Sequence, residues 1–178
     1  MCGLSVLFGK EGNEEKEERR GMTMADVNPI PSDYPRVSAY LSVNGATDAI
    51  DFYRSVLGAE ERLRMEGPDG KVGHAELVIG DSMVMLADEF PGMSAPSPAT
   101  VGGSPVTLMI YVEDVDQTFG AALEAGAKEI RAVADQFYGD RSGQFEDPFG
   151  HRWNVASHVE DVPPEEMTKR AAEAMSGG

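Results

Sequence analysis

Cysteine is almost absent from this chain, since Cys2 is the single one among 178 residues. One cysteine forms no intramolecular disulfide, which favours a reducing compartment. Basic residues are also few: 15 Lys and Arg stand against 31 Asp and Glu, and the formal net charge is -16. Nucleic acids and anionic membrane surfaces bind through positive charge on the protein, so we expect neither as a partner.

Long hydrophobic runs are missing too. A helix that spans a bilayer needs about 18 or more apolar residues, and no run in the chain is that long. The apolar first eight residues lack the basic start of a secretory signal. We therefore expect a cytoplasmic protein. With hydrophobic residues at 41%, the chain has the composition of one globular domain.

Prolines gather between residues 29 and 35, which is typical of a linker. We therefore predict a flexible tail over residues 1–33 and one folded domain over residues 34–160. Residues 161–178 are predicted to form a C-terminal helix and tail, with Pro164 in the first turn of that helix.

The folded domain is predicted to begin with a strand. Apolar and polar side chains alternate over residues 36–43. Because successive side chains of a strand point to opposite faces, Ser38, Tyr40 and Ser42 share its polar face.

A helix is predicted next, because apolar residues recur at helical spacing between residues 49 and 57. Thr47 or Asp48 suits its N-cap, and Gly58 suits its end. The first module, residues 37–88, then has the order β-α-β-β-β. Its last three strands are predicted over residues 60–65, 74–79 and 83–86.

The same order recurs after a linker rich in Pro, Gly, Ser and Ala over residues 89–105. Val43 precedes a helix-ending Gly-Ala pair by 15 residues, and Val112 precedes a second such pair by 14. This repeat predicts an α+β fold of two tandem β-α-β-β-β modules that form a concave mixed sheet around a cleft, with helices outside. The second module, residues 106–159, has a helix capped by Asp114 or Asp116, and strands over residues 106–112, 129–134, 142–146 and 152–157.

A tight turn is predicted within residues 147–154 (DPFGHRWN), just before the last strand. Pro148 fixes one backbone angle there, and Gly150 tolerates a positive φ. Asn154 then lies on the strand. Trp153 alternates with Asn154 and is expected to pack against a helix.

Three segments resemble the vicinal oxygen chelate superfamily, which includes glyoxalase I, fosfomycin-resistance and bleomycin-resistance proteins and extradiol dioxygenases. The segments are residues 49–59, with AIDFY and LGA, residues 74–82, and residues 147–151. Residues 137–143 (FYGDRSG) are similar to the PhnB-like subgroup. The resemblance covers about residues 37–159 and implies the fold described above.

Enzymes of this superfamily hold a divalent metal at four positions. None of the residues at the matching positions is a His, Asp or Glu, the donors that hold such metals. The resemblance therefore implies that the standard metal centre is absent, and we predict no cofactor. The four matching positions are Ser38, Met85, Thr107 and Asn154.

A relocated metal site is the alternative. His74 and Glu76 lie two apart on one strand, so their side chains point the same way and are candidates for a shared divalent metal. Glu146 and His158 are further candidates near the final strands. With such a metal, the protein would be a metal-dependent lyase, transferase or dioxygenase.

Without a metal, the resemblance implies a protein of the bleomycin-resistance type that binds a small hydrophobic or aromatic molecule, as in antibiotic resistance. The acidic surface favours a cationic ligand. A metal-free enzyme that uses Tyr, His or Asp as acid or base is a third interpretation, for which the sequence identifies no catalytic residue. A homodimer, swapped or unswapped, is expected by analogy. The candidate ligand-binding residues are Ser38, Tyr40, Ser42, Met85, Thr107, Met109, Tyr111, Arg141 and Asn154.

Overall fold

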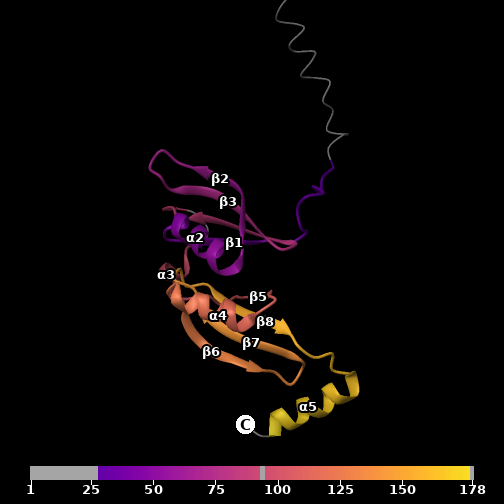
Figure 1. Cartoon of the computed structure of the whole chain (residues 1–178). Helices are drawn as coiled ribbons and strands as arrows, with labels where there is room; N and C mark the ends of the chain where they lie inside the picture. The colour runs from indigo at the N-terminus through magenta and orange to yellow at the C-terminus, as the bar shows by residue number, and fades with distance from the viewer. Residues whose placement is uncertain (1–27, 93–94, 177–178) are drawn as a thin grey trace, which may run out of the picture. The chain divides into compact units, whose positions relative to one another are not determined.

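The computed structural model describes residues 28–92 and 95–176 of the chain (Figure 1). The chain divides into two compact units, Met1–Arg36 and Val37–Gly178. The described part of the first unit, residues 28–36, contains no helix or strand. Cys2 and the predicted tail before residue 28 lie outside the described residues. The helices and strands named below belong to the second unit.

The first module contains β1 (Ala39–Val43), α2 (Ala46–Leu57), β2 (Glu60–Glu66), β3 (Val72–Ile79) and β4 (Ser82–Asp88). Its four strands form one sheet in the order β1-β4-β3-β2. Strand β1 runs parallel to β4, and the other neighbours are antiparallel.

The second module repeats this arrangement, with the sheet order β5-β8-β7-β6 and β5 parallel to β8. The order confirms the predicted α+β fold of two tandem β-α-β-β-β modules, and each module has a sheet of its own. A short helix, α3 (Pro98–Val101), lies in the predicted linker. The other elements are β5 (Thr107–Tyr111), α4 (Val115–Glu124), β6 (Lys128–Asp135), β7 (Asp140–Glu146), β8 (Arg152–His158) and α5 (Pro164–Ser176).

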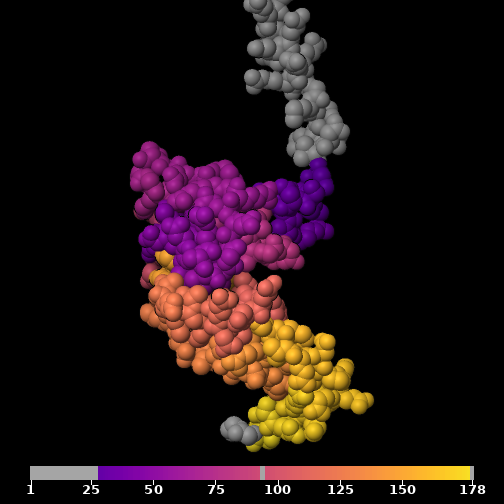
Figure 2. Space-filling model, viewed as in Figure 1, coloured from indigo at the N-terminus to yellow at the C-terminus, as the bar shows by residue number. Residues whose placement is uncertain are grey.

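The C-terminal helix α5 lies apart from both sheets, at the yellow end of the unit (Figures 1 and 2). None of its described side chains is buried. Arg170 of α5 pairs with Glu160, at 2.8 Å, and with Glu166, at 3.0 Å. Exposed ion pairs of this kind stabilise a helix only slightly. No helix among the described residues is long and apolar enough to cross a membrane.

The N-terminus of α2 is capped from a distant strand. Thr47 and Asp48 were the predicted caps, but the helix begins at Ala46, after Gly45 with a φ of 91°. The carboxylate of Asp88, at the end of β4, accepts hydrogen bonds from the backbone N–H groups of Gly45 and Ala46, both at 3.0 Å. Thr47 and Asp48 lie inside the first turn and not at the N-cap position, which Gly45 occupies, and Asp88 instead satisfies the backbone N–H of the first helical residue, Ala46.

Other helix ends follow the sequence prediction. Gly58, with a φ of 65°, ends α2. Asp114 caps α4 and accepts a hydrogen bond from the backbone N–H of Gln117 at 2.9 Å. These helix ends can be predicted from the sequence because each capping residue lies within a few residues of the backbone groups that it satisfies.

One hydrophobic core joins the two modules. Tyr53 of α2 is fully buried, and its ring lies 5.5 Å from that of Trp153 on β8. Phe145 of β7 packs against Phe119 of α4, with 6.1 Å between ring centroids. Trp153 therefore packs toward a helix, as predicted.

Each sheet has a helix face, whose side chains enter this core, and an opposite face, which we name the open face. Strand alternation divides the residues between them, because neighbours along a strand point to opposite sides. In the first sheet, the buried Leu41, Ala75 and Leu86 define the helix face. The open face of the first sheet then carries Tyr40, His74, Glu76 and Met85, and that of the second carries Thr107, Met109, Tyr111, Gln144 and Asn154.

Candidate functional site

Strand register places several predicted site residues in rows across the open faces. In the first sheet Tyr40 lies opposite Met85, and Met85 lies opposite Glu76. In the second sheet Met109 lies opposite Asn154. Cross-strand neighbours share a face and contact each other. The structure therefore brings Tyr40 together with Met85, and Met109 together with Asn154.

A chain of hydrogen bonds crosses the open face of the first sheet. The hydroxyl of Tyr40 lies 2.9 Å from Nδ1 of His74, and Nε2 of His74 lies 3.3 Å from Oε1 of Glu76. Glu76 is only 4% exposed, and its Oε2 lies 3.6 Å from Nε of Arg62. Partial burial raises the pKa of Tyr40, so the phenol is neutral at physiological pH.

Asn154 is oriented on the open face of the second sheet. Its Oδ1 accepts a hydrogen bond from Nη2 of Arg131 at 3.0 Å, and its Nδ2 lies 2.9 Å from the sulfur of Met109. Beside it, Nε2 of Gln144 donates to the hydroxyl of Thr107 at 3.2 Å. This face therefore presents oriented amide and hydroxyl groups next to a thioether.

Asp140 is buried and joins Tyr111 to His158 at the end of the same face. It accepts from the Tyr111 hydroxyl and from Nδ1 of His158, both at 2.8 Å. Nε2 of His158 lies 3.1 Å from Asp161. The hydrogen bond to Asp140 raises the pKa of Tyr111, and the bonds to Asp140 and Asp161 raise the pKa of His158.

Arg141 does not join the other predicted ligand-binding residues. Its guanidinium donates twice to Asp116 of α4, at 2.7 Å for both bonds, and once to Asp135 at 3.0 Å. It neighbours Ser142, which shares the face of Asn154, so alternation turns Arg141 to the helix face. Arg141 therefore lies apart from the other predicted ligand-binding residues, and its contact with a ligand stays a prediction.

The two predicted serines lie near Tyr40. Ser38 precedes β1 and is half-buried, and Ser42 lies on β1, on the face of Tyr40. The backbone carbonyl of Ser42 accepts a hydrogen bond from Nε2 of His151 at 3.1 Å. The turn after β7 thereby contacts β1 of the first module.

The two open faces line different cavities. Tyr40 and Ser42 line one of about 140 Å³ together with linker residues such as Pro105. Met109 and Tyr111 line another of about 300 Å³ with the turn between β3 and β4. Within one chain, the predicted ligand-binding residues that line these cavities therefore form two separate sets, one on each sheet.

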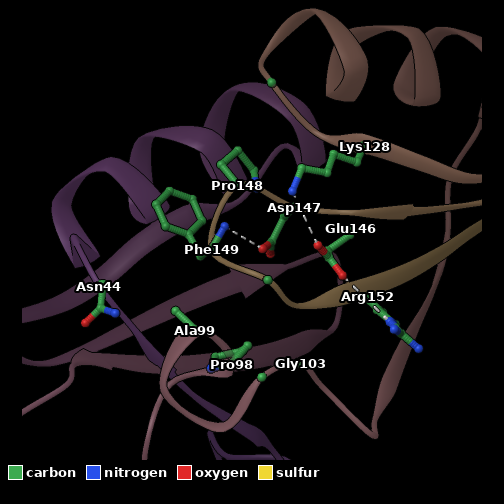
Figure 3. Close-up of a pocket in the computed structure, with 13 residues that line it drawn as sticks. Asn44, Pro98, Ala99, Gly103, Lys128, Glu146, Asp147, Pro148, Phe149 and Arg152 are labelled. Atoms are coloured by element: carbon green, nitrogen blue, oxygen red, sulfur yellow. Dashed lines mark hydrogen bonds and ion pairs between the residues drawn. The ribbon is translucent and has the colours of Figure 1, made fainter.

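A larger cavity of about 540 Å³ adjoins the open face of the second sheet (Figure 3). Glu146 lies in its wall, 3.9 Å from Nζ of Lys128 and 3.9 Å from Nε of Arg152. In the strand register Glu146 lies opposite both Lys128 and Arg152, and Arg152 lies opposite Thr107 on β5. Glu146 was a candidate metal ligand in the sequence, and here its carboxylate pairs with two basic side chains.

The residues at the four metal positions of the resemblance do not fit a metal. Ser38, Met85, Thr107 and Asn154 offer two hydroxyls, a thioether and an amide, and the amide oxygen of Asn154 already accepts from Arg131. The described residues contain no group of three or more His, Cys, Asp or Glu side chains placed to hold a metal. His74 and Glu76 do share a face, but both ring nitrogens of His74 have protein partners.

Sequence reasoning missed three contributors to these faces: Arg131, Asp140 and Gln144. Asp140 belongs to the FYGDRSG segment, and the similarity of that segment to the PhnB-like subgroup was the one sequence feature that pointed to it. Gln144 alternates with the buried Phe145 on β7, so periodicity also places it on the open face. Arg131 follows a register shift in β6, which no local pattern reveals.

Comparison with known proteins supports the fold. The profile of the Glyoxalase/Bleomycin resistance protein/Dioxygenase superfamily matches residues 36–155. The uncharacterized protein Mb0911c of Mycobacterium bovis is 44% identical over 136 residues, covering 75% of this chain and 90% of that protein. The crystal structure of TioX from Micromonospora sp. ML1 has a TM-score of 0.55 and 26% identity, covering 70% of this chain and 99% of TioX. The PhnB protein of Bacillus cereus, with a TM-score of 0.56 and 17% identity, covers 69% of this chain and 99% of its own, and is similar in fold.

Proposed function

Since the chain belongs to the glyoxalase/bleomycin resistance protein/dioxygenase superfamily, we propose that it binds a small hydrophobic or aromatic molecule on its open sheet faces. The exposure of large side chains there carries the proposal: Tyr40 is 49%, Met109 is 46% and Tyr111 is 60% exposed. Exposed apolar and aromatic side chains on the open face of a sheet are typical of binding surfaces.

Polar groups on these faces favour a ligand with hydrogen-bond donors. The Tyr111 hydroxyl donates its hydrogen bond to Asp140, so its oxygen lone pairs are left as acceptors for a ligand. The net charge of -16 attracts cations over the whole surface. A flat, cationic aromatic compound with N–H groups combines these properties.

The proposed binding uses no divalent metal. Hydroxyl, thioether and amide groups at the four matching positions lack the charge that holds such an ion against water. Elemental analysis of protein purified without chelators tests this point. A stoichiometric transition metal would favour the alternative of a metal-dependent enzyme instead.

We also propose that the protein is a homodimer. The open faces of one chain line separate cavities, so a second copy that covers each face would complete two enclosed sites. Sedimentation velocity distinguishes a dimer from a monomer. A monomer at concentrations where ligand binds tightly would contradict this proposal and leave the faces as open half-sites.

A thermal-shift screen of cationic aromatic compounds tests the binding proposal. A ligand that binds only the folded state raises Tm as its concentration exceeds Kd. Uncharged analogues of each compound are the matched controls. The absence of any shift across the panel would contradict the proposal.

A further inference from the structure

Tyr40, His74 and Glu76 form a hydrogen-bond chain whose direction follows from chemistry. The Glu76 carboxylate beside Arg62 only accepts, so Nε2 of His74 carries the proton that bridges their 3.3 Å contact. In a neutral imidazole the other nitrogen, Nδ1, is then an acceptor. The hydroxyl of Tyr40, 2.9 Å away, therefore donates to it.

Burial increases along this chain, from the exposed phenol to the buried carboxylate. Tyr40 is 49% exposed, and the side chains of His74 and Glu76 are 24% and 5% exposed. A base oriented by a buried carboxylate, with its other nitrogen toward a surface hydroxyl, is the arrangement that activates hydroxyl groups in many enzymes. Tyr40 occupies the hydroxyl position here.

We propose that Tyr40 is a base-assisted phenol that transfers protons to and from a ligand on the open face of the first sheet, with His74 as the base. Glu76 is the positioning residue, because it fixes the tautomer and orientation of His74. The matching ligand class is a small molecule with a weakly acidic O–H or C–H bond. This chemistry goes beyond binding and relies on the proposed function only for where the ligand lies.

The proton transfer balances without a metal or an oxidant. As the ligand's proton moves to the Tyr40 oxygen, the phenolic proton of Tyr40 moves to Nδ1 of His74. The imidazolium formed keeps its Nε2–H on Glu76, whose negative charge stabilises it. The phenolate of Tyr40 never accumulates, so the high pKa of a phenol is no obstacle.

Tyr111 supplies a matched control within the same protein. It is more exposed than Tyr40, at 60%, and its hydroxyl donates to the carboxylate of Asp140. An aspartate is a weaker base than an imidazole by about 2–3 pKa units in model compounds. Exposure alone predicts that Tyr111 reacts faster, and base assistance predicts that Tyr40 does.

Labelling with an aryl sulfonyl fluoride, followed by peptide mass spectrometry, separates these expectations. The Tyr40 oxygen attacks sulfur, an O–S bond forms, the S–F bond breaks, fluoride leaves, and the phenolic proton goes to His74. At pH 7.5 we expect Tyr40 to react about tenfold faster than Tyr111. His74→Gln should reduce the Tyr40 rate to that of Tyr111, and Glu76→Gln should reduce it partly.

Two results would overturn the proposal. One is wild-type protein in which Tyr111 reacts as fast as Tyr40 or faster, a comparison that needs no variant to fold. The other is an unchanged Tyr40 rate in a folded His74→Gln protein, as judged by circular dichroism. Since the labelling needs no bound ligand, its failure is distinct from failure of the binding screen.

Discussion

The phenol of Tyr53 donates a 2.7 Å hydrogen bond to the carboxylate of Asp147, which lies 94 residues later in the chain. Both side chains are buried, and Asp147 also accepts from the indole N–H of Trp153 at 2.9 Å. Burial raises the pKa of Tyr53 well above its usual value, so the phenol stays a donor. This bond joins the helix of the first module to the β7–β8 turn of the second.

Removal of the Tyr53 hydroxyl is expected to destabilise the protein. Tyr53→Phe leaves the ring in the core but deprives a buried carboxylate of one donor, a loss of about 1–3 kcal/mol. Urea unfolding of the variant and the wild type measures this difference. Tyr138→Phe, in the partly exposed β6–β7 turn, is the matched control and should change stability by less than about 0.5 kcal/mol. Equal stability of Tyr53→Phe and the wild type would contradict the account of this bond.

Asp88 is a second long-range connection, because it accepts from the backbone of Val72 at 2.8 Å as well as from the two donors that start α2. Asp88→Ala leaves three buried or half-buried N–H groups without this acceptor, so we expect a loss of about 2–4 kcal/mol. Chemical denaturation measures it. Asp81→Ala, in the exposed β3–β4 turn, is the control. Similar stabilities of the two variants would show that Asp88 does not cap α2.

The raised pKa of His158 predicts a pH-dependent stability. A histidine whose pKa is higher in the folded state stabilises the protein fully below its unfolded pKa, about 6.5, and loses this effect as pH rises through the folded value. The Tm of wild type should therefore exceed that of His158→Gln most at pH 5–6, with a gap that narrows toward alkaline pH. Thermal unfolding of both proteins in matched buffers checks this. A gap that stays constant or widens with pH would contradict the two carboxylate contacts.

Much of the fold was predictable from local patterns. Alternation identified β1 and placed Tyr40 on one face, and Gly58 marked the end of α2. The cap from Asp88 was not predictable, since it depends on where β4 ends beside α2. The helix α3 was missed because four residues in a Pro- and Gly-rich stretch give no periodicity.

The candidate site was also predictable only in part, because local patterns show which face a residue lies on but not which residues it contacts. Alternation put Met109 and Asn154 on one face of their strands, but only register shows that they contact each other. The bond from Tyr40 to His74 spans 34 residues and depends on the β3–β4 and β1–β4 pairings together. Alternation with Ser142 places Arg141 on the helix face, and its ion pair with Asp116 of α4 depends on how α4 packs on the sheet, which no local pattern reveals.

Calorimetric titration with a cationic aromatic compound from the thermal-shift screen tests the central claim most directly. Met109→Ala removes a thioether from the open face of the second sheet and should weaken binding about tenfold, the loss of about 1–2 kcal/mol of apolar contact. Met175→Ala on α5, where the side chain is 85% exposed, is the matched control and should leave Kd unchanged. Equal Kd values for wild type and both variants would contradict binding on this face.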